Sequence, residues 1–376
     1  PFWARRIRMA FCVAACSLAL AAPGSSSHTA AFASRERALS PRDVSLAITD
    51  LASSWNTTVD QCGAGTPLLL APPEGGRFLP GMPESVLATL QPATAGDSHH
   101  LYASLVYHIH REDKAVDEAL TLHSSISKHD PAARFAWFVH PDDEDELRGW
   151  NLTGVTLLPI NDADLCVTRV ALGMPQVTHH SGPSLVWFKL LFPLLLPAPF
   201  MVADTDMVAR APLAPLWTAG GAASAPLLLF GVELGRLNSG LLYFDSTPGE
   251  ADWRSCLSQG TEYVQAHTSF LSWPEQSVLN WVCGAALHPT YDWDTMEGTP
   301  TAPCSAQCAP FADSLFMTGC SVGESADQTW DQLSGADAVK EPPAIFHYNC
   351  NSTLLAAERE AALRASPAYE STRPAV

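Results

Sequence analysis

The stretch that decides the fold is residues 185–208, LVWFKLLFPLLLPAPFMVADTDMV. An amphipathic run leads into four apolar residues, 200–203, and Asp204 and Asp206 follow directly. A strand that ends in Asp-x-Asp holds two carboxylates at the rim of a sheet, where hard divalent cations find the oxygen ligands that they prefer. The stretch therefore predicts a buried strand followed by two carboxylates that share a divalent cation with a diphosphate.

Three other Asp-x-Asp pairs occur in the chain. Only the pair at 204 and 206 directly follows an apolar strand and is followed by another apolar pair, Met207 and Val208. We interpret the other three as solvated turn or helix-cap carboxylates; they are Asp143/Asp145, Asp162/Asp164 and Asp292/Asp294.

The segment before this stretch alternates between two kinds of pattern. Apolar runs predict strands, and the runs between them predict helices; in order, they are a strand at 101–109, a helix at 115–129, a strand at 134–139, an acidic helix at 142–150 and a strand at 154–160. Alternating strands and helices are typical of a parallel sheet with crossover helices. Ligands of such sheets bind at the carboxyl ends of the strands, where Asp204 and Asp206 would lie.

Composition restricts the class of protein. The 376 residues are 47% hydrophobic and 16% charged, which indicates a globular chain. The formal net charge of −18 argues against a nucleic-acid partner, which needs basic patches. Few lysines and arginines are available to neutralise an anionic nucleotide, so a bound cation would have to do so.

The amino terminus indicates a secretory route. Arg5, Arg6 and Arg8 precede an uncharged apolar run at residues 9–22, as in a signal peptide. A signal anchor that holds the protein in the membrane is the alternative, although a comfortable span takes about 20 apolar residues. We expect residues 1–35 to be this signal or anchor, 36–98 a Pro/Gly/Ser-rich stem, 99–355 the catalytic domain and 356–376 a tail.

Cysteines and sequons agree with that route. Of ten cysteines, Cys12 and Cys16 lie in the targeting segment, which leaves eight, an even set that suggests disulfides. Residues 290–343 predict a disulfide-rich insertion near the C-terminus. Cys304 and Cys308 resemble half of a zinc site, but no second such pair lies nearby. Glycosylation sequons begin at Asn56, Asn151 and Asn351. We expect a protein of the Golgi or ER lumen (type II anchored) or a secreted one.

Four blocks carry a resemblance to a known family. The segment KLLFPLLLPAPFMVADTDMV resembles the strand-and-metal segment of family 8 retaining glycosyltransferases, which include glycogenin and bacterial lipooligosaccharide galactosyltransferases. Three further blocks are similar to the family's later motifs and follow in its order: LNSGLLYFD at 237–245, PEQSVLN at 274–280 and IFHY at 345–348. Together the blocks extend over roughly residues 100–355.

The resemblance implies an α/β fold of the GT-A nucleotide-binding type, with a mostly parallel sheet flanked by helices. It implies a hexosyl- or pentosyltransferase that uses a UDP-sugar donor and Mn²⁺ or Mg²⁺, with a glycan, a protein or a small molecule as acceptor. The implied metal ligands are Asp204, Asp206 and His347. The implied donor-binding residues are Lys189, Asp204, Asn238, Ser239 and Gly240, and the implied catalytic residues are Glu275 and Gln276.

Each role has a plainer alternative. Lys189 could be solvated, His347 could be an ordinary core or surface histidine, and Pro274 with Glu275 could simply start a helix. Gly240 would let the donor approach the backbone closely.

Retention requires either a nucleophile that forms a covalent intermediate or attack from the leaving-group face, and the sequence leaves both routes open.

The chain also departs from the family pattern. Glu275 and Ser277 stand where the family usually has aspartates, and Cys350 and Thr353 stand where it has Gly and a Lys or Arg that grips the diphosphate. Residues 105–113 give no clean match to the uracil-binding segment. A catalytically inactive secreted binding protein with the same fold is therefore the alternative function.

We interpret the histidines at 99, 100, 108 and 110 as scattered surface residues rather than a metal site.

Overall fold

The computed structural model describes residue 90 and residues 100–107, 115–160, 185–222, 228–233, 236–266, 274–283, 308–312, 315–318 and 343–348. All of them belong to one compact unit, Ala38–Val376. The expected signal segment, stem and tail lie outside the described residues. Among the residues that the structure describes, no helix is long and apolar enough to cross a bilayer.

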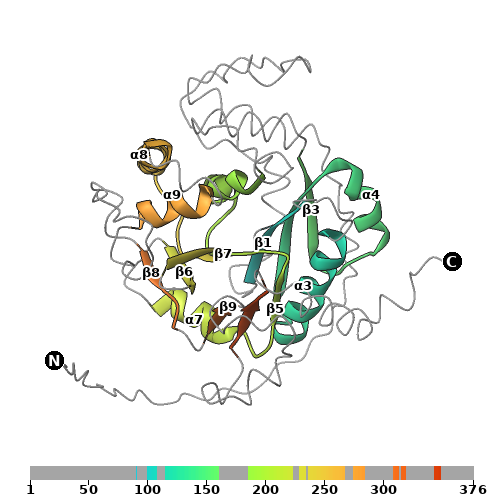
Figure 1. Ribbon diagram of the computed structural model, residues 1–376. Coiled ribbons are helices and arrows are strands. Elements are labelled where there is room, and N and C mark those ends of the chain that lie inside the picture. The colour runs from blue at the N-terminus through green and yellow to red at the C-terminus, as the bar shows by residue number, and fades with distance from the viewer. Residues whose placement is uncertain are drawn as a thin grey trace, which may run out of the picture. The chain divides into compact units, whose positions relative to one another are not determined.

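The main sheet has seven strands in the order β3-β2-β1-β4-β7-β6-β8 (Figure 1). The first four are mutually parallel, β7 runs antiparallel to β4 and β6, and β8 is parallel to β6. The expected mostly parallel sheet is thus confirmed. The strands are β1 (His100–Val106), β2 (Ala133–Val139), β3 (Val155–Pro159), β4 (Phe200–Ala203), β6 (Leu228–Glu233), β7 (Arg236–Phe244) and β8 (Cys308–Pro310).

Helices cover both faces of this sheet, as expected for the α/β class. Along β1, Ala103 and Leu105 pack into one hydrophobic cluster, and Tyr102 and Val106 pack into the other, because successive strand residues face opposite sides. The first cluster takes residues from η2 (Leu185–Leu191), α6 (Phe192–Leu195), α8 (Glu250–Ala266) and α9 (Pro274–Val282). The second takes them from α3 (Ala115–His129), α4 (Pro141–Gly149) and α7 (Ala214–Ala222).

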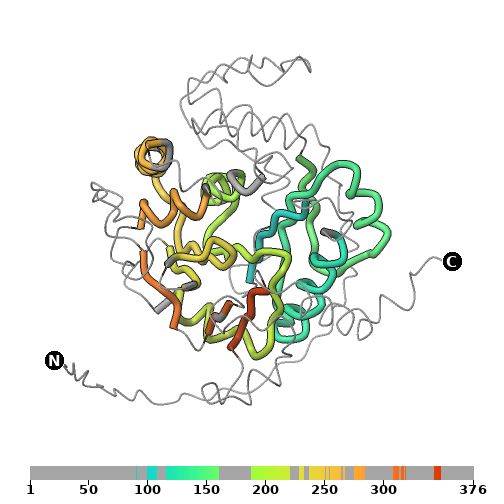
Figure 2. The backbone as a smooth tube through the Cα atoms, viewed as in Figure 1, coloured from blue at the N-terminus to red at the C-terminus, as the bar shows by residue number. Residues whose placement is uncertain are grey.

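A second, three-stranded sheet has the order β5-β10-β9. Strand β5 (Met207–Ala209) begins directly after Asp206, and it pairs antiparallel with β10 (Ile345–His347), which is parallel to β9 (Phe316–Thr318). The register sets His347 opposite Met207. A segment near the C-terminus is thereby brought beside the Asp-x-Asp loop (Figure 2).

The secondary structure expected before residue 160 is confirmed with shifts of one or two residues at most ends. The exception is the first strand, because β1 ends at Val106 and residues 108–110 lie outside the described residues. His100 Nδ1 donates to Asp130 Oδ2 (2.7 Å), and its ring stacks on Trp217, so this histidine is half-buried rather than a surface residue. The histidines at 99, 108 and 110 lie outside the described residues.

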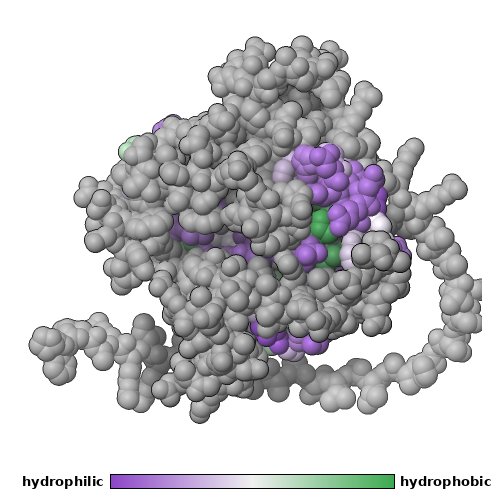
Figure 3. Space-filling model, turned by 45° about the vertical axis from the view of Figure 1, so that its right-hand side comes forward, coloured by the Kyte–Doolittle hydropathy of each residue, from purple (hydrophilic) through white to green (hydrophobic). Residues whose placement is uncertain are grey.

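Two of the other Asp-x-Asp residues lie on α4. Asp143 is in its first turn, where a carboxylate favours the positive end of the helix dipole. This position agrees with the expected helix-cap carboxylate, but Asp143 is 6% exposed and therefore not solvated. Asp145, on the same acidic helix, is exposed. Figure 3 shows hydrophilic side chains (purple) gathered in a patch at the upper right of that view, beside a few hydrophobic ones (green). The pairs at 162/164 and 292/294 lie outside the described residues.

The expected disulfide-rich insertion is seen only in part. A disulfide joins Cys283, just after α9, to Cys308 at the start of β8. Because the Cys308 sulfur is taken up in this bond, it offers no thiolate to a zinc ion. Cys256 on α8 is also disulfide-bonded.

Candidate metal centre and its surroundings

The Asp-x-Asp loop connects β4 to β5 and is fixed by its backbone. Asp204 N–H donates to the carbonyl of Gly240 on β7 (2.9 Å), and Met207 N–H donates to the carbonyl of Asp204 (3.2 Å). On the other side, Tyr348 N–H donates to the carbonyl of Asp206 (3.0 Å). The loop is therefore held between β7 and the end of β10, which limits the directions that its side chains can take.

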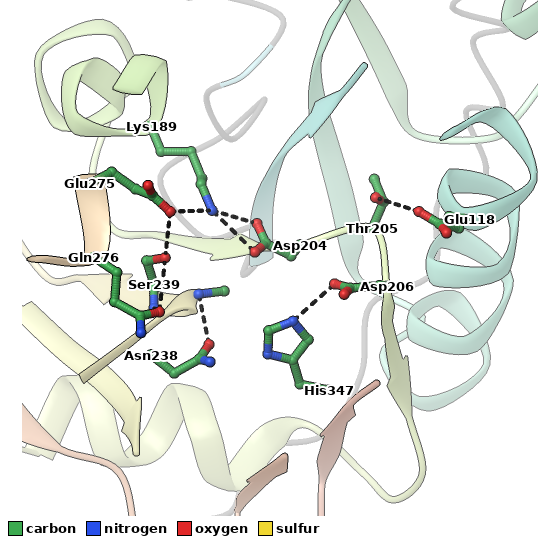
Figure 4. A network of polar contacts seen from close by, with 11 residues as sticks. Glu118, Lys189, Asp204, Thr205, Asp206, Asn238, Ser239, Glu275, Gln276 and His347 are labelled. Atoms are coloured by element: carbon green, nitrogen blue, oxygen red, sulfur yellow. Dashed lines mark hydrogen bonds and ion pairs between the residues drawn. The ribbon is translucent and has the colours of Figure 1, made fainter. Parts of the chain in front are cut away.

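Three potential ligands converge at this loop. Asp204, Asp206 and His347 each offer one ligand atom, and these atoms lie within 4.8 Å of one another. His347 Nε2 is 3.0 Å from Asp206 Oδ1 (Figure 4). The aspartate side chains are 27% and 28% exposed whereas that of His347 is 6% exposed, so the carboxylates are open to a ligand and the imidazole approaches from the protein side. Two carboxylates and one imidazole suit Mn²⁺ or a similar divalent cation.

Lys189 lies behind Asp204 and is 3% exposed, so its interpretation as a solvated lysine is wrong. Its Nζ donates to both Asp204 oxygens, at 2.8 and 3.1 Å, and is 3.9 Å from Glu275 Oε1. Burial lowers the pKa of Lys189, but the carboxylates of Asp204 and Glu275 outweigh it and leave the pKa raised. Lys189 is therefore a charged internal partner of Asp204, and its direct contact with a donor stays a prediction.

The site carries excess negative charge. Three carboxylates against one ammonium give a net charge of −2 when Asp204, Asp206 and Glu275 are all ionised and the imidazole of His347 is neutral. Burial raises the pKa of Glu275 despite the nearby Lys189. For Asp206, burial acts in the same direction, but His347 and Lys189 outweigh it and lower the pKa. A cluster of side chains with net negative charge, in which Asp206 is ionised, is suited to a divalent cation.

Ser239 orients the two residues expected to be catalytic. Its backbone N–H donates to Gln276 Oε1 (3.1 Å), and its hydroxyl donates to Glu275 Oε1 (3.0 Å). Because a backbone N–H can only donate, the Gln276 amide must turn its oxygen to Ser239, which leaves its NH₂ group for another acceptor. Glu275 is 1% exposed, and no described residue pairs with its Oε2, whereas Gln276 is half-buried. Of the two, Gln276 is the accessible one.

Asn238 and Gly240, on β7, lie beside His347. Asn238 Oδ1 accepts from Gly240 N–H at 2.8 Å and is buried. A Cβ at Gly240 would lie 2.6 Å from Met207 Cε and 2.7 Å from His347 Cε1. The structure thus gives a reason for this glycine other than close approach of a donor: the imidazole of His347 packs against it.

Two sets of residues at the site were missed by the sequence motifs. Asn280 lies in the quoted PEQSVLN block but received no role; its amide bonds both the N–H (3.1 Å) and the carbonyl (3.0 Å) of Leu237 and ties α9 to β7. Thr205 and Glu118 bond to each other at 3.2 Å, and no local pattern links two residues so far apart in the chain.

Comparisons with known proteins give structural similarity only. The chain matches no protein-family model and no curated protein sequence. It is similar to mouse xyloside xylosyltransferase 1 in its apo form, with 12% identity and a TM-score of 0.43 over 67% of this chain and 98% of that one. It is also similar to two structures of the glycosyltransferase GlyE of Streptococcus pneumoniae TIGR4, one of them the apo form, with 11% identity and TM-scores of 0.42 and 0.41. Each match covers 71% of this chain and 60% of GlyE. Because these TM-scores lie below 0.5, we base the proposed function on the site and on the sequence motifs.

Proposed function

We propose that this protein is a metal-dependent retaining glycosyltransferase that transfers a hexose or pentose from a UDP-sugar to an acceptor. The observation that carries the proposal is the convergence of Asp204 and Asp206, from one loop, with His347, from a distant part of the chain. The four motif blocks support it, since the residues that they imply as ligands are the ones that meet. Family 8 membership, UDP as the nucleotide, and a glycan, protein or small-molecule acceptor belong to the proposal.

The chain's own residues would divide the work as follows. Asp204, Asp206 and His347 would hold Mn²⁺ or Mg²⁺, which when bound supplies Lewis-acid stabilisation of the charge on the departing diphosphate. Lys189 holds both oxygens of Asp204 and limits the rotation of that carboxylate. Ser239 fixes the Gln276 amide so that its NH₂ group can donate to a hydroxyl of the sugar or acceptor.

The state of Glu275 favours one of the two retaining routes. A carboxylate nucleophile must reach the anomeric carbon, yet Glu275 is enclosed and its pKa is raised by burial. Both features make it a poor nucleophile. We therefore propose attack from the leaving-group face, with Glu275 serving to hold Lys189 and Ser239.

The cellular setting is also part of the proposal. The basic and apolar residues at 1–22 and the sequons support the secretory pathway, in the Golgi or ER lumen or after secretion, with residues 1–35 as a cleaved signal or a membrane anchor. The disulfide between Cys283 and Cys308 supports the same route, because such bonds persist in oxidising compartments.

A second candidate is an inactive binding protein that keeps the metal and the fold. Cys350 and Thr353 favour it, because they stand where the resembled family carries glycine and the basic residue that grips the diphosphate. Turnover separates the two candidates, since a binding protein retains a UDP-sugar without cleaving it.

A panel of UDP-sugars, assayed for release of UDP with Mn²⁺, with Mg²⁺ and with a chelator, tests the proposal. We expect turnover of at least one donor that needs the cation, and its loss in Asp206→Asn. Asp145→Asn is the matched control, because Asp145 belongs to another Asp-x-Asp pair on the exposed helix α4 and should leave turnover unchanged. Turnover that persists in chelator would disprove the metal assignment, and cation and donor binding without turnover would support the binding protein.

A further inference from the structure

The residue between the two aspartates faces away from the metal centre. Thr205 is buried, and its side chain points to helix α3 while those of Asp204 and Asp206 point to the centre (Figure 4). Its Oγ1 donates to Glu118 Oε2 on α3 at 3.2 Å. Thr205 stands between the two aspartates in a tight turn that the bond from Met207 N–H to the carbonyl of Asp204 closes, so holding its side chain on the helix side limits the directions that the flanking carboxylates can take.

A second contact joins the same helix to the strand that follows. Ala209 N–H, on β5, donates to Ser125 Oγ at 3.1 Å, and Ser125 Oγ donates in turn to the carbonyl of Leu122. Glu118 and Ser125 are seven residues apart, which is two helical turns, so they lie on one face of α3. Helix α3 thus contacts both the Asp-x-Asp loop and β5 through side chains of a single face.

The two contacts of α3 affect the positions of all three metal ligands. Asp204 and Asp206 flank Thr205 directly, and β5 is the strand against which β10 sets His347, opposite Met207. A shift of the loop relative to α3 would therefore move the carboxylates relative to the imidazole. Neither Thr205 nor Glu118 belongs to the group of convergent ligand atoms.

We propose that Thr205 and Glu118 are positioning residues for the cation: their hydrogen bond sets the separation of the two carboxylates and thereby the affinity of the centre for Mn²⁺. The inference rests on the metal site of the proposed function, but it concerns residues that touch neither cation nor donor. Groups that orient metal ligands without touching the metal change metal affinity by about 10- to 100-fold when they are removed.

The test is direct Mn²⁺ binding by the full chain without any donor, read from the EPR signal of free Mn²⁺ during titration. We expect Thr205→Val, which keeps the shape and removes the hydroxyl, to weaken Mn²⁺ binding by about 10- to 100-fold. Thr205→Ser keeps the donor and should stay within about threefold of the natural protein. Glu118→Leu should match Thr205→Val, and the double variant should lose little more, since both changes remove one interaction.

Thr121→Val is the matched control. Thr121 is a fully buried threonine on α3 whose hydroxyl donates to the carbonyl of Asp117 in the same helix. It should lose stability, measured by thermal unfolding in chelator, without losing Mn²⁺ affinity. Glu118→Leu changes a half-buried helix residue and keeps the test available if Thr205→Val does not fold.

The outcomes separate this inference from the function on which it rests. Natural protein that binds Mn²⁺ while Thr205→Val binds it equally well overturns the positioning role alone. An equal loss in Thr121→Val overturns it too, since a general loosening of α3 would then be sufficient. Natural protein that binds no Mn²⁺ overturns both proposals. Weakened binding in Thr205→Val with no UDP-sugar turnover in the natural protein supports the positioning role and contradicts the enzymatic function.

Discussion

Lys189 is a buried cation between two carboxylates, and its removal should be costly. Its Nζ is 2.8 Å from Asp204 Oδ1 and 3.9 Å from Glu275 Oε1, and the residue is 3% exposed. In Lys189→Met both carboxylates lose their counter-ion inside the protein. Removing one partner of a buried ion pair costs roughly 3–5 kcal/mol. Because the Asp204 side chain is 27% exposed and partly screened, we expect the lower end, about 3 kcal/mol.

Equilibrium urea unfolding in chelator, followed by tryptophan fluorescence, measures this loss. Adding Glu275→Gln should recover about 1–2 kcal/mol, because the amide needs no counter-ion and can still accept from Ser239. Lys128→Met, at the exposed end of α3, is the control and should stay within about 0.5 kcal/mol. The account would be refuted if Lys189→Met lowered the free energy of unfolding by less than about 1 kcal/mol. It would also be refuted if the effects of Lys189→Met and Glu275→Gln were additive, since the two residues would then not interact.

Three further predictions concern the same centre. Gly240→Ala should cost about 1–3 kcal/mol of stability and weaken Mn²⁺ binding, since its Cβ meets His347 Cε1 at 2.7 Å; calorimetric titration showing natural affinity would contradict this. Gln276→Glu removes the NH₂ donor and should lower kcat/KM about tenfold, whereas a glycosylated carboxylate at position 276 in the mass spectrum would indicate a nucleophile instead. The pKa of Asp206 is lowered because His347 and Lys189 outweigh burial, so its contribution to stability is present above the ordinary carboxyl pKa of about 3.9 and is lost as pH falls through the lowered value. In chelator, Asp206→Asn should therefore flatten the loss of stability below about pH 4, and an unchanged acid limb in thermal unfolding would count against the interaction.

The sequence predicted the parts of the fold that have local signals. The apolar residues of β4 and the carboxylates after them are contiguous, so the strand and the loop could be read directly. The strands and helices from β1 to β3 are long enough to show their periodicity. The reversed direction of β7 could not be read, because strand direction depends on which distant segment pairs with β4.

The site was predicted as a set of residues but not as a set of contacts. Short strands such as β5 and β10, of three residues each, carry no periodicity, and only the IFHY motif, which contains β10, pointed to His347. The enclosure of Glu275 and Lys189 depends on packing between η2, α9 and the loop, which no single segment encodes. The bond from Thr205 to Glu118 joins residues 87 apart; Thr205 is the variable position of the Asp-x-Asp motif, and Glu118 lies outside the four motif blocks.

The most direct test of the account is pulsed EPR of Mn²⁺ bound to the full chain. Three ligands around one point predict one Mn²⁺ per chain with hyperfine coupling to a single imidazole nitrogen. The coupling should vanish in His347→Gln, and binding should collapse in Asp206→Asn. A bound Mn²⁺ with no nitrogen coupling, or one that persists unchanged in both variants, would place the cation elsewhere and contradict the proposed centre.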